Sequence, residues 1–511
     1  MFLYDGNAQG LLPDRKISHI FFEISIIIPY LCINGNNYGC TNSLKTQIAN
    51  IKILIYSKTT IDRQMKKILF FSAFALCVGM ASCSDDDDLA PSAGIATSNG
   101  GTEVMQFDTL TLAADVKNVA TEEANNYVWK VNGTEVGRGK TYKFVQAKTG
   151  TYELELTVTD DAAATPLTTK QKLTVTGRFG EGAFLLNEGN FGNETGTLTY
   201  IDGKKGVVID SAYYRVNGTL LGNVCQNLFI ANDKMYIISQ NGAKNGGEGL
   251  LTIANAKTLE KISVLSPKEL DGKMPTHVAV IGNNIYVRAN NGIHLIDKNN
   301  AVSLIEGTEQ AKNSPMAVIG NKLYAQTNGN QILVIEGKAV ASTIEVAGAV
   351  SGIVKAQDGN LWVSTLNPNT IAKINASDNK LMDSHALKQN ITAGWGAIAG
   401  FSAKGTNIYF CDASDYANST KIFKHDFAAN TTTEIGEVAK IITDSKMFYN
   451  SLAIDPETEE IYFASLKGWG PDYKVNNTTI FTLNGNSIAK KYNFEGVNSF
   501  PAGIYFVANF K

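Results

Sequence analysis

The chain has 511 residues, more than one hydrophobic core usually serves, so we expect at least two domains. Its 45 basic and 48 acidic residues give a net charge of −3, which argues against a nucleic-acid-binding surface and a polybasic membrane patch. Glycine far outnumbers proline, and tyrosine and phenylalanine are frequent, as is typical of short strands joined by tight turns. The composition therefore favours soluble, all-β domains.

A secretory signal begins inside the sequence, at Met65. Lys66 and Lys67 precede an apolar run of about 13 residues, which is shorter than the roughly 20 residues of a membrane-spanning helix. This pattern favours export and cleavage. We assign residues 65–82 to a signal peptide and residues 1–64 to a mis-assigned start outside the folded protein.

The signal ends in Met80-Ala81-Ser82-Cys83, which resembles a bacterial lipobox. The resemblance implies a lipid on the Cys83 thiol, cleavage just before it, and anchorage to a membrane. Asp85–Asp88 follow and resemble the acidic export tag of surface-exposed Bacteroidetes lipoproteins. We therefore expect residues 83–93 to be a tether and the protein to face outward from the outer membrane. The alternatives are a plain secretory signal, a merely solvated spacer, and a periplasmic location.

Residues 94–177 alternate apolar and polar side chains over short runs, which predicts half-buried antiparallel strands. The clearest runs are Thr109–Leu112, Tyr127–Val131, Tyr152–Val158 and Lys172–Val175. Asn132-Gly133 is a strong hairpin signal. Strands at this spacing predict an immunoglobulin-like (Ig-like) β-sandwich.

The segment Trp129–Gly133, with Gly150-Thr151-Tyr152 and Val158-Thr159-Asp160 after it, resembles PKD-type extracellular domains. The resemblance implies that Trp129 packs between the two sheets. We interpret this domain as a spacer, with ligand binding as the alternative.

A short sequence motif, made of apolar residues, a polar turn and an aromatic residue, recurs across residues 178–511. Its aromatic anchors are Phe184, Tyr236, Tyr286, Tyr324, Trp362, Tyr409 and Tyr462. Their spacing of roughly 40 to 50 residues is that of four-stranded blades and predicts a seven-bladed β-propeller. The first segment lacks an inner strand, so we expect the C-terminal strand Pro501–Val507 to complete that blade and close the ring. The anchors are expected to be core residues, as are the thiols of Cys225 and Cys411.

In a propeller, the loops between blades and the loops after each second strand emerge on one face, where function usually lies. The candidate ligand-binding residues on this face are Asn187, Glu188, Asn190, Phe191, Gln226, Gln240, Asn290, Asn328, Asn367, Trp395, Asp412, Tyr416, Tyr449, Trp469 and Tyr473. Asn241, Thr276, Asp415, Phe448, Asn450, Asp472 and Phe500 lie in the same predicted loops. Aromatics and amides suit a planar or sugar-like ligand, although asparagine is also an ordinary turn residue.

Catalytic and metal-binding motifs are missing from the sequence. It contains no nucleophile elbow, no zinc-protease helix motif, no phosphate-binding loop, and no histidines at metal-ligand spacing. We therefore predict a protein that is not an enzyme and that uses no cofactor or metal. Asp412 and Asp415 leave open a calcium site or a lactonase-like reaction as alternatives.

The stretch Gly182–Gly192, with the phrase LLNEGNFG, resembles a propeller family of Bacteroidetes surface lipoproteins, some labelled surface-layer proteins. Its best understood relatives are cobalamin-capture lipoproteins that cover an outer-membrane transporter. The resemblance implies binding of cobalamin or a related corrinoid and delivery to a TonB-dependent transporter. The alternative is a structural, adhesive or glycan-binding surface protein.

Overall fold

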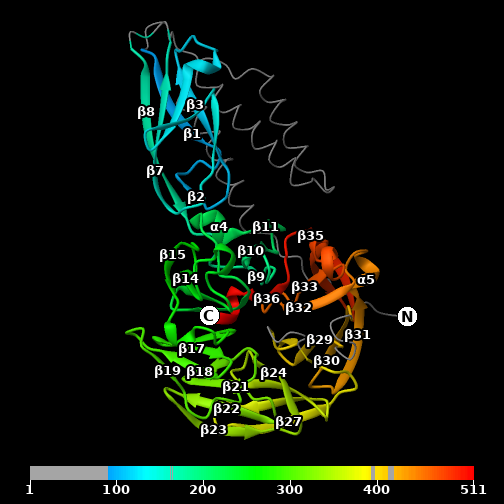
Figure 1. Ribbon diagram of the computed structural model, residues 1–511. Coiled ribbons are helices and arrows are strands. Elements are labelled where there is room, and N and C mark those ends of the chain that lie inside the picture. The colour runs from blue at the N-terminus through cyan, green and yellow to red at the C-terminus, as the bar shows by residue number, and fades with distance from the viewer. Residues whose placement is uncertain (1–89, 161–162, 164, 393–397, 413–418) are drawn as a thin grey trace, which may run out of the picture. The chain divides into compact units, whose positions relative to one another are not determined.

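A computed structural model describes residues 90–160, 163, 165–392, 398–412 and 419–511 (Figure 1). Ala90–Lys511 form one compact unit, and most of its regular secondary structure is β-strand. The predicted signal peptide, Cys83 and the Asp85–Asp88 run lie outside the described residues. Among those described, no helix has both the length and the apolar character that a membrane span requires.

The N-terminal part consists of two sheets. The first contains β1 (Ser92–Thr97), β3 (Leu110–Lys117) and β6 (Thr141–Phe144); the second contains β2 (Glu103–Met105), β8 (Leu167–Thr176), β7 (Gly150–Val158), β4 (Tyr127–Val131) and β5 (Thr134–Arg138). β1 begins at Ser92, inside the segment predicted as tether. Each predicted run lies largely within a strand, because alternating residues bury one face of a sheet.

One hydrophobic core joins the two sheets and includes Leu112, Trp129 and Leu154. Trp129 is buried, and its Nε1 donates to the carbonyl of Gly139 at 2.8 Å. The predicted turn is confirmed: Val131 pairs with Thr134, and the two turn residues have positive φ values of 48° and 82°. That geometry suits Asn-Gly, because asparagine and glycine tolerate the left-handed region.

Seven four-stranded antiparallel sheets follow in the described residues, each named here from its inner to its outer strand. They are β36 (Pro501–Phe506), β9 (Ala183–Asn187), β10 (Thr197–Asp202) and β11 (Val207–Ile209); β12 (Cys225–Ala231), β13 (Lys234–Ser239), β14 (Leu251–Asn255) and β15 (Lys261–Leu265); β16 (His277–Ile281), β17 (Asn284–Ala289), β18 (Gly292–Ile296) and β19 (Val302–Leu304); β20 (Ala317–Ile319), β21 (Lys322–Gln326), β22 (Gln331–Glu336) and β23 (Ala339–Glu345); β24 (Ala349–Lys355), β25 (Leu361–Leu366), β26 (Thr370–Asn375) and β27 (Lys380–Ala386); β28 (Phe401–Lys404), β29 (Asn407–Cys411), β30 (Lys421–Asp426) and β31 (Thr431–Glu437); and β32 (Met447–Ile454), β33 (Ile461–Leu466), β34 (Asn476–Asn484) and β35 (Ser487–Glu495). Short helices lie between strands: α4 (Ala212–Asn217), α5 (Val438–Ile441), and the 3₁₀ turns η1 (Ala124–Asn126), η2 (Lys244–Gly246), η3 (Lys268–Leu270) and η4 (Gly470–Lys474). A further 3₁₀ turn, η5 (Val507–Phe510), follows the last strand.

The sheets are arranged as in a β-propeller. Each inner strand contacts the inner strand of the next sheet, from β12 through β32, and β36 contacts both β32 and β12 (Figure 1). As predicted, the C-terminal strand pairs antiparallel with β9, so residues far apart in sequence complete one sheet. The C-terminal strand thus covers the edge of β9, which would otherwise be unpaired.

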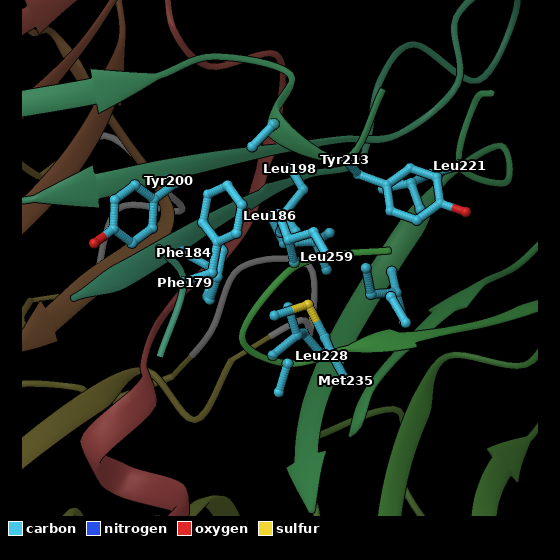
Figure 2. Packing of buried hydrophobic residues seen from close by; sticks show 14 of the residues in the cluster. Phe179, Phe184, Leu186, Leu198, Tyr200, Tyr213, Leu221, Leu228, Met235 and Leu259 are labelled. Atoms are coloured by element: carbon cyan, nitrogen blue, oxygen red, sulfur yellow. The ribbon is translucent and has the colours of Figure 1, made fainter. Parts of the chain in front are cut away.

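The seven aromatic anchors lie on the second strands and are buried, as predicted. Each belongs to a different hydrophobic cluster at the contact between two sheets. Figure 2 shows the first of these clusters, where Phe184 and Leu186 lie with Leu228 and Met235 of the next sheet. The repeated aromatic residue is therefore the residue that packs one sheet on the next.

Tyrosine is the commonest anchor, and its hydroxyl explains why. Tyr286 Oη donates to the carbonyl of Gly337 at 2.9 Å, and Tyr324 Oη donates to the carbonyl of Ala376 at 3.1 Å. Both acceptors lie in the turn between the third and fourth strands of the following sheet. A buried phenol needs such a partner, so each hydrogen bond ties adjacent sheets together while the ring fills the core.

Cys225 and Cys411 are both buried free thiols, as predicted. Burial raises the pKa of each thiol far above its ordinary value. They therefore act as small core residues rather than as nucleophiles.

Candidate functional site

The candidate site lies at the end of the sheets where inner strands begin and second strands finish. In one sheet, Cys225 pairs with Ser239 and Ile238 pairs with Leu251. The loop after each second strand and the loop before each inner strand therefore emerge at the same level. The candidate ligand-binding residues were predicted on this face.

Four aromatic side chains meet on this face: Tyr449, Trp469, Tyr473 and Phe500, which we call the aromatic cluster. Tyr473 and Phe500 stack with ring centroids 4.5 Å apart, and Trp469 lies parallel to Phe500 at 6.4 Å. Tyr449 contacts Trp469 and Phe500 at 5.8 Å and 5.7 Å. Trp469 is 46% exposed, whereas Tyr449 and Tyr473 are buried. The indole of Trp469 is therefore exposed to solvent and is supported by the packed rings of Phe500 and Tyr473.

Glu194, which is not among the residues predicted from the sequence, fixes the position of this cluster. Its Oε1 accepts a hydrogen bond from Tyr473 Oη at 2.9 Å, and its Oε2 accepts from Ser499 Oγ at 2.9 Å and from the backbone N–H of Asn190 at 3.2 Å. One carboxylate therefore joins three loops. The signal in the sequence was weak, because Glu194 follows the LLNEGNFG phrase and has no motif of its own.

Phe500 has a positive φ of 52°, which is unusual for a bulky residue. Its carbonyl accepts a hydrogen bond from the N–H of Glu188 at 2.8 Å, and the Ser499 carbonyl accepts from the N–H of Gly189 at 3.1 Å. These bonds hold the loop before β36 against the loop after β9. Local backbone strain of this kind is concentrated at functional sites in proteins.

Glu188 is a buried carboxyl group beside the aromatic cluster. Tyr449 Oη donates to its Oε2 at 3.3 Å, while Oε1 has no hydrogen-bond partner among the described residues. Burial raises the pKa of Glu188 from 4.5 to about 7, although interactions with Gln226 and Tyr449 partly oppose this shift. The group is therefore poised to change its charge near neutral pH.

The neighbouring predicted residues have mixed environments. Asn187 is buried, and its Nδ2 donates to Thr197 Oγ1 at 3.0 Å. Asn190 Oδ1 accepts from the N–H of Gly192 at 2.9 Å, which closes a local turn. Asn190 fits the ordinary role of asparagine in turns, whereas Asn187 is the last residue of β9 and pairs with Thr197. Phe191 is exposed, with Lys244 Nζ 3.6 Å from its ring centroid, and Gln240 is half-buried.

The other predicted residues do not join this group. Asn290, Asn328 and Asn367 are exposed and follow β17, β21 and β25. Asp412 Oδ1 accepts from the N–H of Asn390 at 3.2 Å. Trp395, Tyr416 and Asp415 lie outside the described residues. The structure thus gathers Glu188, Gln226 and the aromatic cluster, with Asn190 beside Tyr473, and leaves Asn290, Asn328 and Asn367 on separate sheets.

No group of three histidine, cysteine, aspartate or glutamate side chains could hold a metal ion within the part of the chain that is described. The hydrogen-bonding groups of the site are amides, phenols and carboxyls on a rigid base. Such groups bind and orient a ligand through stacking and hydrogen bonds.

These sheets and their closure define a β-propeller-type protein. A solved quinoprotein alcohol dehydrogenase-like protein from Bacteroides thetaiotaomicron is similar, with 16% identity, a TM-score of 0.51, and coverage of 80% of this chain and 96% of that one. A protein from Lactobacillus plantarum is similar at 12% identity, with a TM-score of 0.42 over 64% of this chain and 99% of that one. The chain belongs to the family described as Domain of unknown function (DUF5074), whose model matches residues 181–507. No curated protein matches it significantly.

Proposed function

We propose that this protein is a surface-anchored binding lipoprotein that captures a small ligand, cobalamin or another corrinoid, for a TonB-dependent outer-membrane transporter. In this proposal the seven sheets are the blades of one propeller, and the Ig-like, PKD-type domain is a spacer behind a lipid on Cys83. The protein binds its ligand without changing it chemically.

The aromatic cluster beside Glu188 is the observation that carries this proposal. Trp469 is exposed on a base of Phe500 and Tyr473, and rings held in this way stack on a flat ligand with little loss of conformational entropy. A corrinoid has a large, nearly planar ring with amide side chains at its edge. The buried carboxyl group of Glu188 and the amide of Gln226 lie at the base of the cluster and supply hydrogen bonds to such a periphery.

Trp469 gives the sharpest test of the binding surface. We expect Trp469→Ala to weaken cyanocobalamin binding about 10-fold or more, because an exposed aromatic anchor contributes on the order of 1–3 kcal/mol to binding. Titration of the purified protein, followed by calorimetry or by the visible spectrum of the corrinoid, measures this change. Since Trp469 is 46% exposed, the folded structure should tolerate the substitution.

Tyr492→Ala is the matched control. Tyr492 lies on β35, the outer strand of the same sheet, and its ring stacks on Phe494 at 6.1 Å. Its loss should leave corrinoid affinity unchanged. Absence of binding by the wild-type protein at micromolar concentration would falsify corrinoid capture. Binding to glycan arrays that depends on Trp469 would then favour the glycan-binding alternative.

Anchorage is tested separately at Cys83. We expect Cys83→Ser to abolish incorporation of a labelled fatty acid and to move the protein from the membrane fraction to the soluble fraction, because the thiol is the proposed acylation site. Surface proteolysis of intact cells tests the outward orientation. Membrane retention of an unlabelled Cys83→Ser protein would contradict the lipid anchor without affecting the ligand proposal.

A further inference from the structure

A cavity of about 380 Å³ lies at the opposite end of the sheets from the candidate site. It is lined by residues near the ends of β32 and β36, near the beginning of β9, and in the turn after β10. The candidate site lies instead where inner strands begin and second strands finish. The volume of the cavity is within the range of small-molecule pockets, so a ligand can be contained there.

Tyr200 and Tyr462 line this cavity, and neither hydroxyl has a hydrogen-bond partner among the described residues. The two side chains are otherwise buried, with exposed fractions of 3% and 2%. Figure 2 shows Tyr200 at the edge of its cluster, with its hydroxyl directed away from Leu186 and Leu198. Tyr462 thus differs from the anchor Tyr286, whose hydroxyl donates to the next sheet. Because a buried phenol needs a partner, the two hydroxyls indicate a polar ligand.

Glycine residues leave room for both hydroxyls at the end of the first sheet. The rings of Tyr200 and Tyr462 pack on opposite faces of that sheet, in different clusters. At the end of the sheet, a Cβ on Gly203 would collide with Tyr462 Oη, and a Cβ on Gly182 would lie 3.0 Å from Tyr200 Oη. Both glycines line the cavity, so one space reaches the two hydroxyls.

Asp202, the last residue of β10, lies close to both hydroxyls. Burial raises the pKa of both phenols, that of Tyr200 to about 12, and the negative charge of Asp202 adds to both shifts. Both phenols therefore keep their protons at neutral pH, and each can donate one hydrogen bond and accept others. The cavity thus contains two neutral hydroxyl groups beside a carboxylate.

The charged side chains around the cavity are largely paired with protein groups. Three ion pairs include residues of the lining: Lys204–Glu457, Lys205–Asp202 and Arg178–Asp108. Asp455 accepts from the backbone N–H of Glu457 at 2.8 Å, and the exposed Glu181 and Lys511 have opposite charges. An ion would therefore find few charges to neutralise, whereas a hydroxyl group can donate to a paired carboxylate or accept from a paired ammonium group.

We propose that this cavity binds a neutral, polyhydroxylated ligand of the size of a monosaccharide or disaccharide. The hydroxyls of Tyr200 and Tyr462 exchange hydrogen bonds with those of the ligand, and the Asp202–Lys205 pair binds further ligand hydroxyls. Phe506, which also lines the cavity, adds an apolar contact for the C–H groups of a sugar ring. The site goes beyond the proposed corrinoid capture and does not depend on it. It also differs from the glycan-binding alternative, which uses Trp469.

Titration of the purified protein with sugars, followed by saturation-transfer NMR, tests this site. The neutral probes are glucose, galactose, mannose, N-acetylglucosamine and the disaccharides built from them; glucuronate and protonated glucosamine are the charged comparisons. We expect at least one neutral sugar to bind, and to bind at least about 5-fold more tightly than either charged sugar. Tyr200→Phe and Tyr462→Phe should each weaken that binding by about 3- to 10-fold, through the loss of one neutral hydrogen bond.

The same two variants separate ligand binding from folding. Each keeps the ring and removes a hydroxyl without a protein partner, so the unfolding temperature should stay the same or rise. Tyr286→Phe is the matched control: it removes a hydroxyl that donates to the carbonyl of Gly337, so it should lower the unfolding temperature and leave sugar binding unchanged.

Three results would each overturn this assignment: no binding of any neutral sugar, tighter binding of a charged sugar, or unchanged sugar affinity in both Tyr200→Phe and Tyr462→Phe. Sugar binding that is lost in Trp469→Ala but kept in the two phenylalanine variants would place the sugar on the aromatic cluster and also overturn it.

Discussion

Replacing Trp362 by alanine is expected to lower the free energy of unfolding of the propeller by about 3–5 kcal/mol. Trp362 is fully buried on β25 and packs in the cluster between its own sheet and the next one. Its ring contacts Phe427 edge to face at 4.7 Å, and Lys373 Nζ lies 4.8 Å from its centroid. Alanine would leave a cavity that rigid sheets on both sides cannot close.

Urea unfolding followed by circular dichroism measures this loss. Trp362→Phe should cost only about 1–2 kcal/mol, because a phenyl ring fills much of the space of the indole and Nε1 has no hydrogen-bond partner among the described residues. Met382→Ala, at a 52% exposed position on β27 of the same sheet, should change stability by less than about 0.5 kcal/mol. A cost for Trp362→Ala as small as that of Met382→Ala would show that the anchor does not hold the sheets together.

The propeller-type fold was predictable because its packing repeats. Tyr286 and Tyr324 occupy the same position of the repeated sequence motif. Each ring packs between two sheets, and each hydroxyl donates to a carbonyl of the next sheet. The closing strand was also predictable, because the first segment lacked an inner strand and the C-terminal strand belonged to no other segment. Such signals are local and periodic, so a single sequence reveals them.

The site was predictable only in part. Loop position placed Tyr449, Trp469 and Tyr473 on one face, but their stacking on Phe500 depends on the side chains of separate loops. Asn187 was chosen for its residue type and is instead buried in its own sheet.

Glu188 couples the candidate site to pH. Burial raises its pKa from 4.5 to about 7, so between these values the folded protein holds a proton that the unfolded chain has released. Stability from this group is therefore greatest below pH about 4.5, decreases as the pH rises, and is fully lost above pH about 7. The shift corresponds to about 3 kcal/mol.

Glu188→Gln should remove this dependence, because glutamine resembles the protonated carboxyl group. Relative to the wild type, the variant should gain up to about 3 kcal/mol between pH about 4.5 and 8, as measured by urea unfolding at several pH values. Glu269→Gln, at an exposed position in η3, is the control and should leave the profile unchanged. Parallel profiles for Glu188→Gln and the wild type would refute the raised pKa.

The same carboxyl group should report on ligand binding. A ligand that donates a hydrogen bond to the free Oε1 favours the carboxylate and lowers the pKa of Glu188, so binding near pH 7 should release a proton. Calorimetry in buffers with different ionisation enthalpies counts that proton. Release by the wild type, but not by Glu188→Gln, would place the donor of the ligand at Oε1. Equal release by both proteins would place the ligand elsewhere on the face.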